Sequence, residues 1–312
     1  MNKKDLRIVF MGTPDISAKT LESMILDGFN IVGVVAQMDK PVGRKKTLEK
    51  VPTKVVAEKY SIPVFQPYKI RKDFEFLKEL KPDLILTLAY GQIVSQEILD
   101  IPTYGCLNLH GSLLPKYRGA SPIQSALINN EKFTGVTLMR MIREMDAGEM
   151  YVKKVVEIEE DDNSTSLFNK IQVACFDIVK ESLMDVINSS IKGEIQNENE
   201  VTFCSMIKKE QEKLDLNKSK EEIIGWVRGL SYEPGSYFLL DNLKIKILKA
   251  KVYNDLVTDE IGKIIKADKN GLIFQAINGQ ISILELQKEG KKVMDYKSFI
   301  NGNQNLVGKR FY

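Results

Sequence analysis

The sequence predicts an α/β protein of two domains, the first built on a doubly wound parallel sheet and the second on short antiparallel strands. Continuous apolar runs at 6–11, 31–36 and 83–89 imply strands that are buried on both faces, as in parallel sheets covered by helices. Helical patterns separate these runs. Beyond residue 205 the pattern changes to short alternating segments between Asn-Gly and Asp-Asn turns, which is typical of antiparallel strands.

The elements of the first domain follow one another in a regular order. The first apolar run is followed by Gly-Thr-Pro and by a helical pattern up to Gly28, which indicates a strand, a turn and a helix. Further strands are expected at 31–36, 83–89, 106–110, 135–140 and 151–158, and further helices around 55–60, 74–80, 120–129 and 167–187. We therefore expect the first domain to span 1–188.

A polar stretch rich in Asn, Ser and Glu comes next, and we interpret 189–204 as a linker. The second domain is expected at 205–312. Its first element is a helix, expected around 220–230. Strands are expected near 243–250, 262–265, 271–276 and 280–286. Short strands joined by Asn-Gly turns indicate a small antiparallel barrel or sandwich.

The composition argues against several classes of protein. The apolar run before Gly12 is too short for a signal peptide or a membrane span, so we expect neither. The three cysteines lie far apart without C-x-x-C spacing, which favours a reducing cytoplasm over a disulfide framework or a zinc site. With one histidine in the chain, a metal site is disfavoured. The first turn lacks the full G-x-G-x-x-G pattern, so NAD is not expected.

The charge is distributed unevenly along the chain. Residues 1–204 carry 26 Lys and Arg against 28 Asp and Glu, whereas 205–312 carry 19 against 14, so the second domain is the basic one. A basic small domain suits a phosphate backbone, but an excess of this size is also typical of a solvated surface. Charge alone therefore leaves a nucleic-acid partner open.

The most informative segment is 105–122, GCLNLHGSLLPKYRGASP. It places the sole histidine, His110, at the carboxyl end of a buried strand, where ligands bind in open α/β sheets. Asn108 lies two residues earlier and hence on the same face of that strand. Asp146 follows a later strand and is the candidate carboxylate that orients the imidazole.

An amide, an imidazole and a carboxylate at one strand edge suit acyl transfer without a covalent enzyme intermediate. An amine attacks a carbonyl, Asn108 and His110 donate hydrogen bonds to the developing oxyanion, and Asp146 stabilises the charged imidazole and accepts the amine's proton, directly or through water. The structural alternative is that His110 bonds to the backbone, Asn108 forms a turn and Asp146 caps a helix. Spacing alone leaves both interpretations open and the substrate unknown.

The strings NLHGSLLPKYRGASPIQ and MDAGEM resemble the hallmark motifs of the folate-dependent formyltransferases. In that family an Asn-x-His, a Ser-Leu-Leu-Pro loop and a later Asp form the active site. The resemblance implies catalytic roles for Asn108, His110 and Asp146 in a Rossmann-like formyltransferase domain, with 10-formyl-tetrahydrofolate as the formyl donor. The folate-binding residues that it implies come from two turns: Tyr90, Gly91, Gln92, Ser112, Leu113, Leu114 and Pro115.

The second domain resembles the OB-like β-barrel of those family members that act on methionyl-tRNA, and this resemblance spans nearly the whole chain. It implies formyl transfer to the α-amino group of methionyl-initiator tRNA in translation initiation, by a cytoplasmic monomer without a membrane partner or a metal. The alternative acceptor is a small amine such as an amino sugar nucleotide. The residues expected to contact the tRNA are all basic: Arg44, Lys45, Lys46, Arg228, Lys244 and Lys246.

These basic residues also allow ordinary interpretations. The basic run around 40–46 is equally typical of a solvated surface loop, and the lysines at 244–251 are typical of edge strands that resist aggregation. At 231–235 the chain reads Ser-Tyr-Glu-Pro-Gly, without the tryptophan that is usual in the family. We therefore expect the contacts of that turn to differ from the family pattern.

Overall fold

The computed structural model describes residues 1–42 and 47–312, and these divide into two compact units. The first unit comprises Met1–Pro122, Thr134–Glu157 and Phe168–Cys204, and the second comprises Ile123–Phe133, Ile158–Leu167 and Ser205–Tyr312. Two short segments before residue 168 thus belong to the second unit, although the sequence analysis placed them in the first domain. No helix in the described part of the chain is both long and apolar enough to cross a bilayer.

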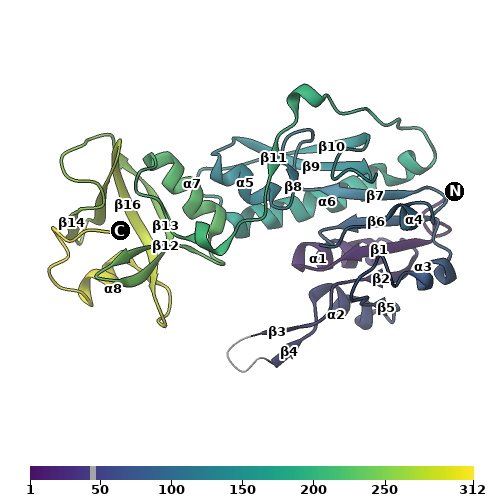
Figure 1. Ribbon diagram of the computed structural model, residues 1–312, viewed down its shortest axis with the longest axis horizontal. Helices are drawn as coiled ribbons and strands as arrows, with labels where there is room; N and C mark the ends of the chain where they lie inside the picture. Colours follow the sequence, from purple (N-terminus) through teal and green to yellow (C-terminus); the bar gives the residue numbers. More distant parts are fainter. Residues whose placement is uncertain (43–46) are drawn as a thin grey trace. The chain divides into compact units, whose positions relative to one another are not determined.

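The sheet of the first unit has seven strands in the order β10-β9-β7-β6-β1-β2-β5 (Figure 1). Their bounds are β1 (Ile8–Gly12), β2 (Ile31–Val35), β5 (Val64–Phe65), β6 (Leu84–Leu88), β7 (Cys106–His110), β9 (Phe133–Arg140) and β10 (Met150–Glu157). From β7 to β5 every neighbouring pair is parallel. The doubly wound parallel sheet predicted from the apolar runs is thereby confirmed.

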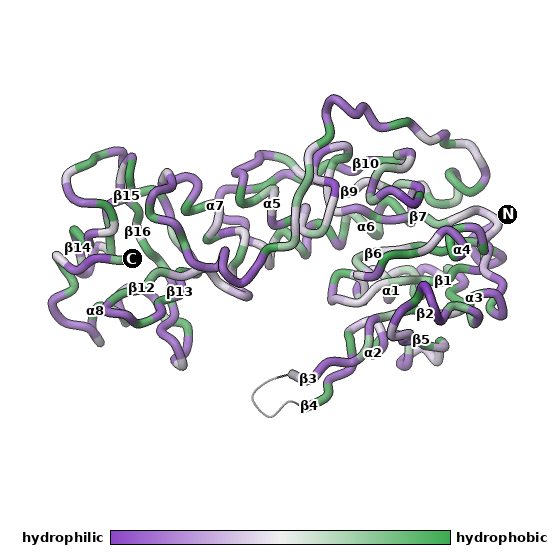
Figure 2. Tube along the Cα trace, viewed as in Figure 1, coloured by the Kyte–Doolittle hydropathy of each residue, from purple (hydrophilic) through white to green (hydrophobic). Residues whose placement is uncertain are grey.

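Burial explains why these runs are continuous. All five residues of β1 and all five of β6 are buried, and the same strands form a hydrophobic part of the trace in Figure 2. The helices of this unit are α1 (Asp15–Leu26), α2 (Pro52–Lys59), α3 (Glu75–Leu80), α4 (Gln96–Leu99) and, from Phe168 onward, α6 (Ser164–Ile187). Because helices cover the sheet, its central strands have no polar face, and alternation is absent from their sequence.

Two features of the first unit were not predicted. Strand β9 runs antiparallel to β7, and the edge strand β10 has alternating exposure, as an edge with one solvated face should. The basic run around residue 40 forms the stem of a hairpin, in which β3 (Lys40–Val42) pairs with β4 (Thr47–Glu49). The sequence predicts only a loop here, because neither three-residue strand is long enough to show a periodic pattern.

Residues 189–204 are attached to the rest of the first unit at several points, although most of them are exposed. Glu194 exchanges two backbone hydrogen bonds with Met150, both 2.8 Å long. Further on, β11 (Phe203–Cys204) pairs with β8 (Arg118–Gly119). Most side chains of the segment are exposed and polar, and its attachments are hydrogen bonds, so its composition resembles that of a linker.

The second unit is an antiparallel barrel. Its strands β12 (Ser236–Leu240), β13 (Leu243–Asn254), β14 (Ile264–Asp268), β15 (Gly271–Ala276) and β16 (Gly279–Lys288) are arranged in the order β12-β13-β16-β15-β14, with β17 (Met294–Asp295) beside β16. The last residues of the chain connect the two outer strands. Leu239 exchanges two 2.9 Å hydrogen bonds with Tyr312, and the Ile264 N–H donates to the Lys309 carbonyl at 2.8 Å. The barrel alternative of the sequence analysis is therefore the one that the structure adopts.

The barrel encloses an aromatic core. Phe238, Phe274 and Phe311 are fully buried, and each pair of rings has its centroids 5.4 Å apart. Helix α7 (Lys220–Leu230) packs Ile223 and Val227 into the same cluster. The remaining helices of this unit are α5 (Pro122–Ile128), which begins in the first unit, and α8 (Tyr296–Asn301). The helix predicted around 220–230 is confirmed, and in the structure the Ser219 side chain caps its first turn.

Candidate active site

Asn108 and His110 lie on β7, and the strand ends at His110. Their side chains lie on the same face, because residues two apart on a strand point in the same direction. In the sheet register Asn108 lies beside Thr87 of β6 on one side and Met139 of β9 on the other. His110 is buried, whereas Asn108 is half-buried. The amide is therefore accessible at the strand edge, and the imidazole lies beneath the surface.

Both ring nitrogens of His110 face acceptors. The Nε2–H group donates to the Tyr117 carbonyl oxygen at 2.8 Å, since a carbonyl can only accept. On the other side of the ring, Nδ1 lies 3.6 Å from Oδ1 of Asp146. That separation is longer than a direct hydrogen bond but close enough for strong attraction between charges. His110 thus bonds to the backbone, as the structural alternative expects, and also faces Asp146, as the catalytic hypothesis expects.

Asp146 is held in the loop between β9 and β10. Its backbone is left-handed, with φ at 53°, a conformation that is uncommon for residues other than glycine. Its Oδ2 accepts a 2.9 Å hydrogen bond from the backbone N–H of Gly119. No described helix begins at this loop, so Asp146 is not a helix cap. The carboxylate is therefore fixed between a backbone donor and the imidazole.

The turn at 112–115 is fixed by hydrogen bonds to β9. Thr137 Oγ1 donates to the Ser112 carbonyl at 2.7 Å and accepts from the Leu114 N–H at 3.1 Å. Ser112, Leu114 and Pro115 are buried, and Leu114 packs with two methionines of the sheet. Leu113 is the partly exposed member of the turn. Of the predicted folate-binding side chains in this turn, Leu113 is thus the one that can contact a ligand without rearrangement.

The turn at 90–92 has its backbone at the surface and one side chain in the core. The Tyr90 ring is buried among apolar residues, and burial raises the pKa of its phenol. The Tyr90 carbonyl accepts from Thr13 Oγ1 at 3.1 Å and from Gln37 Nε2 at 3.2 Å. Gln92 accepts from the Ile70 N–H at 2.8 Å, and Gly91 has φ at 86°. This turn is therefore rigid, and it presents Gly91 and Gln92 rather than the Tyr90 side chain.

The predicted tRNA contacts differ in how far the structure describes them. Arg44, Lys45 and Lys46 lie outside the described residues. Lys244 and Lys246 are half-buried on β13, and Lys244 Nζ lies 3.8 Å from the centre of the Tyr237 ring. Burial lowers the pKa of Arg228, and its guanidinium donates to two carbonyls of the second unit. These belong to Asp162 and Glu159, each at 2.7 Å.

Arg228 thus has a structural role that its position in the sequence did not indicate. Through it, α7 is bonded to the segment 158–167, which explains why this segment belongs to the second unit. Arg228 could contact a phosphate only through the guanidinium N–H groups that do not take part in these two hydrogen bonds.

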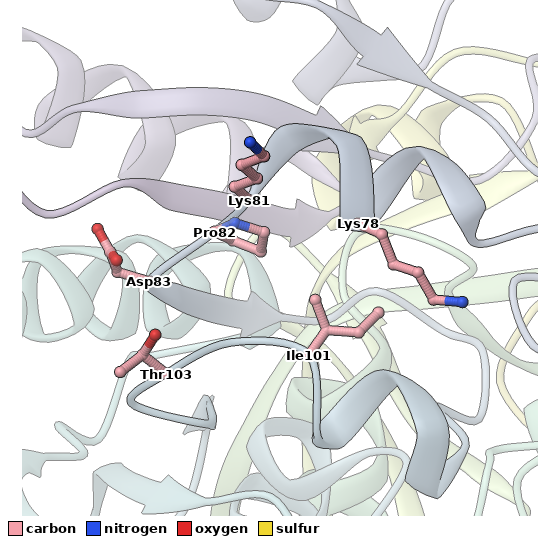
Figure 3. Close-up of a pocket in the computed structure, with 6 residues that line it drawn as sticks. All are labelled: Lys78, Lys81, Pro82, Asp83, Ile101 and Thr103. Atoms are coloured by element: carbon pink, nitrogen blue, oxygen red, sulfur yellow. The ribbon is translucent and has the colours of Figure 1, made fainter.

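A shallow pocket lies at the opposite edge of the first unit's sheet. The residues that line it come from the segments just before β6 and β7. They are Lys78, Lys81, Pro82, Asp83, Ile101 and Thr103 (Figure 3). Because β6 and β7 are parallel, the segments before them lie at the amino edge, whereas His110 ends β7 at the carboxyl edge. The two ammonium groups in Figure 3 point in different directions. This pocket contains none of the candidate residues, and we assign it no role in the reaction.

The described residues contain no group of three or more His, Cys, Asp or Glu side chains that could hold a metal ion. Two residues close to Asp146 are not among the predicted site residues. Gly119 donates to its carboxylate, and Gln196 donates to its carbonyl. Gly119 lies within the informative segment 105–122, so its proximity could have been suspected. Gln196 lies in the supposed linker, where no local pattern distinguishes it from its neighbours.

Comparison with known proteins places this chain in a family. The family model described as formyl transferase matches residues 6–182, and that of the formyl transferase C-terminal domain matches residues 206–304. The methionyl-tRNA formyltransferase of Bacillus cereus is 42% identical over 308 residues, which cover 98% of each chain. That of Bacillus pumilus is 43% identical over 307 residues, covering 97% of each.

A solved structure supports the fold. The N-formyltransferase from Helicobacter canadensis in complex with folinic acid and dTDP-3-aminofucose matches with a TM-score of 0.69 at 22% identity, over 91% of this chain and 99% of that one. The curated relatives match along nearly the full length, including the barrel. On this combined ground, the chain belongs to the methionyl-tRNA formyltransferase family of formyl transferases.

Proposed function

We propose that this chain transfers the formyl group of 10-formyl-tetrahydrofolate to the α-amino group of methionyl-initiator tRNA. One observation carries the proposal. The imidazole of His110 lies 3.6 Å from the Asp146 carboxylate at the end of β7, with the Asn108 amide on the same face. This is the arrangement that formyl transfer needs, and it occurs in a chain whose relatives along the full length are methionyl-tRNA formyltransferases.

The proposed roles follow from where charge develops. The amine nitrogen attacks the formyl carbon, a new C–N bond forms, and the bond from that carbon to the folate N10 breaks. Negative charge builds on the formyl oxygen, and preorganised donors there lower the barrier. The Asn108 side chain has no hydrogen-bond partner among the described residues, so its N–H₂ group is available to donate. His110 donates once its Nε2–H exchanges the Tyr117 carbonyl for the formyl oxygen.

Asp146 supports this chemistry in two ways. Its negative charge beside Nδ1 stabilises a positively charged imidazole as the oxyanion forms. It also accepts, through a water molecule, the proton that the attacking amine releases, and this proton then passes to N10 of the departing folate. The proposed folate pocket lies between the turns 90–92 and 112–115, with Leu113 contacting the pterin and the backbone of Gly91 and Gln92 bounding it.

The acceptor would be bound by the β3–β4 hairpin and by the barrel. Asp39, immediately before β3, anchors the hairpin stem. Its Oδ2 pairs with Lys54 Nζ at 2.6 Å, and its Oδ1 accepts from Gln66 at 2.8 Å and from the Val51 N–H at 3.3 Å. The two ends of the stem are thereby joined to each other, to α2 and to the residue after β5. Arg44, Lys45 and Lys46, which lie between β3 and β4 in the sequence, are the proposed tRNA contacts of this segment. Arg228, Lys244 and Lys246 are the proposed contacts on the second unit.

The Asp39 anchor predicts a pH-dependent stability. Burial alone raises the pKa of the Asp39 carboxyl, but hydrogen bonds from Lys54, Gln66 and the Val51 N–H outweigh it and lower the pKa below its ordinary 3.8. Because the pKa is lower in the folded state, the Asp39 carboxylate contributes fully to stability at pH values above its ordinary pKa. This contribution is lost as the pH falls through the pKa of the folded state. Asp39→Asn is therefore expected to cost about 1–3 kcal/mol at neutral pH. Below pH 3.8, the difference from wild type should shrink.

Denaturant unfolding at neutral and acid pH measures this difference. Glu58→Gln is the matched control, because Glu58 and its partner Lys50 form an exposed pair of the same chemistry. We expect its unfolding free energy to stay close to that of wild type at both pH values. An Asp39→Asn variant as stable as wild type at neutral pH would refute the anchoring role.

Arg44→Ala is expected to weaken use of the tRNA with little change in turnover. A lost phosphate or acceptor-stem contact should raise the KM for methionyl-initiator tRNA about tenfold and reduce the slope of log affinity against log salt by about 1. Steady-state kinetics and a salt series of tRNA binding measure both. Lys50→Ala, which removes an exposed positive charge just after the stem, is the control and should leave both close to wild type. Unchanged KM and slope in Arg44→Ala would remove Arg44 from the proposed contacts.

The decisive experiment combines the purified chain, 10-formyl-tetrahydrofolate and methionyl-initiator tRNA. Appearance of formyl-methionyl-tRNA is the expected result, and its absence would refute the proposal. Parallel reactions with an amino sugar nucleotide as the acceptor test the alternative substrate. Formylation of that acceptor with none of the tRNA would assign the chain to small amines instead.

A further inference from the structure

The environment of Asp146 contains a second polar cluster that the proposed chemistry does not use. Gln196 is 3% exposed, although it comes from the stretch with linker-like composition. Its Nε2 donates to the carbonyl of Asp146 at 2.7 Å and to that of Gly148 at 2.9 Å, and its Oε1 accepts from Arg118 Nε at 2.9 Å. Carbonyls only accept and a guanidinium only donates, so these partners fix the orientation of the amide.

The partner of this amide is itself buried and paired. Arg118 is 5% exposed, and its terminal nitrogens bond to the exposed carboxylate of Glu198 at 2.8 and 3.4 Å. The next residue, Gly119, donates its N–H to the Asp146 carboxylate. The dipeptide 118–119 thus supports Asp146 from two directions, through Gln196 at the backbone and directly at the side chain.

These hydrogen bonds hold the part of the chain in which Asp146 has a left-handed backbone conformation. A left-handed backbone at a residue with a side chain is intrinsically unfavourable and persists when neighbouring contacts hold it. The Nε2 group of Gln196 donates to the carbonyls of Asp146 and Gly148, which are the first and last residues of this short turn. If they were lost, the turn could relax toward a common conformation. The carboxylate would then move away from the imidazole.

We propose that Gln196 is a positioning residue, which with Arg118 holds the backbone of Asp146 so that its carboxylate stays opposite His110. The inference rests on the proposed function for its kinetic readout, but the geometry on which it acts exists without substrate. The hydrogen bonds of Gln196 go to Asp146, Gly148 and Arg118, and none goes to the imidazole. We therefore expect its effect on the imidazole to pass through Asp146.

Gln196→Glu is the sharpest variant, because it keeps the size and the acceptor for Arg118 but replaces both N–H donors with a carboxylate oxygen that the two carbonyls repel. We expect kcat to fall about tenfold or more, as small misplacements of catalytic groups do, with KM for both substrates within about threefold. Gln196→Ala should behave likewise. Gln96→Glu, the same change at an exposed glutamine, and Glu198→Gln should each leave kcat within about twofold.

A double variant separates positioning from general destabilisation. If Gln196 acts through Asp146, adding Gln196→Glu to Asp146→Asn should lower the residual turnover no further. A multiplied loss, or Gln196 variants with wild-type kcat, would overturn the proposal. Thermal unfolding midpoints of all variants show whether the fold is intact.

The single histidine provides a readout that does not depend on activity. In protein labelled with ¹⁵N-histidine, the imidazole signals report on His110 alone. We expect the Gln196 variants to reproduce the spectral change caused by Asp146→Asn, and Gln96→Glu to leave the spectrum unchanged. An unchanged spectrum in the Gln196 variants would overturn the positioning role even if wild type proved inactive with tRNA. Conversely, a missing wild-type turnover with the expected spectral changes would refute only the proposed function.

Discussion

Replacement of His110 by alanine is expected to lower kcat for formyl transfer at least about 100-fold, with the fold intact. The imidazole is proposed both to donate to the formyl oxygen and to be held by Asp146 at 3.6 Å, so its removal eliminates a donor at the point where charge develops. Loss of one such donor typically costs a factor of about 100 to 1,000. Single-turnover kinetics with saturating tRNA and donor measure the chemical step directly.

A second variant and a control accompany His110→Ala. Asp146→Asn keeps the size of the side chain but removes the charge, so we expect a similar loss in kcat with unchanged tRNA affinity. Asp185→Asn, in which another aspartate loses its charge on the surface of the long helix α6, is the control and should retain wild-type kcat. If both His110→Ala and Asp146→Asn turned over at the wild-type rate, the assignment of the site would be wrong.

Substitution of Gly119 by alanine is expected to lower kcat about 100-fold and to destabilise the first unit. Gly119 has φ at 123°, and a Cβ added there would lie 2.1 Å from the Cys204 carbonyl oxygen. The backbone must therefore shift, separating β8 from β11. The shift also moves the N–H that donates to the Asp146 carboxylate at 2.9 Å. A displacement of about 1 Å near reacting groups can cost a factor of 100 in rate.

Gly28→Ala is the matched control for this prediction. Gly28 also has a positive φ, 86°, but a Cβ there meets nothing within 4 Å, so the variant carries the conformational strain without the clash. We expect it to lose about 1 kcal/mol of stability and no kcat. The readouts are kcat and the free energy of unfolding for both variants. A Gly119→Ala protein as active as Gly28→Ala would show that the β8–β11 contact does not support the site.

Local sequence patterns were sufficient for the framework of this protein. The apolar runs of β1, β2 and β6 predicted buried parallel strands, since a strand covered on both faces must be apolar at every position. Turn residues and alternation predicted the antiparallel second unit, and the position of His110 at the end of β7 predicted the edge at which the candidate site lies. Each of these inferences depends on residues that are neighbours along the chain.

Tertiary structure decided the features that depend on distant partners. The Tyr90 side chain was predicted to bind folate, but its ring packs into the core, because the neighbouring strands provide apolar contacts for it. Arg228 was predicted to contact tRNA, and it bonds to two carbonyls about 70 residues earlier in the chain. Those folate and tRNA roles stay predictions, now with these constraints on how each residue can contribute.

The sequence by itself determined the fold class, the strand that carries Asn108 and His110, and the shared direction of their side chains, because all three follow from local periodicity. Only the tertiary structure decided that Asp146 meets His110 and that Gln196 is buried beneath it. The physical reason is that a polar residue gives no local signal of burial. It can be buried only where partners from other segments satisfy its hydrogen bonds, and those partners come together only in the folded chain.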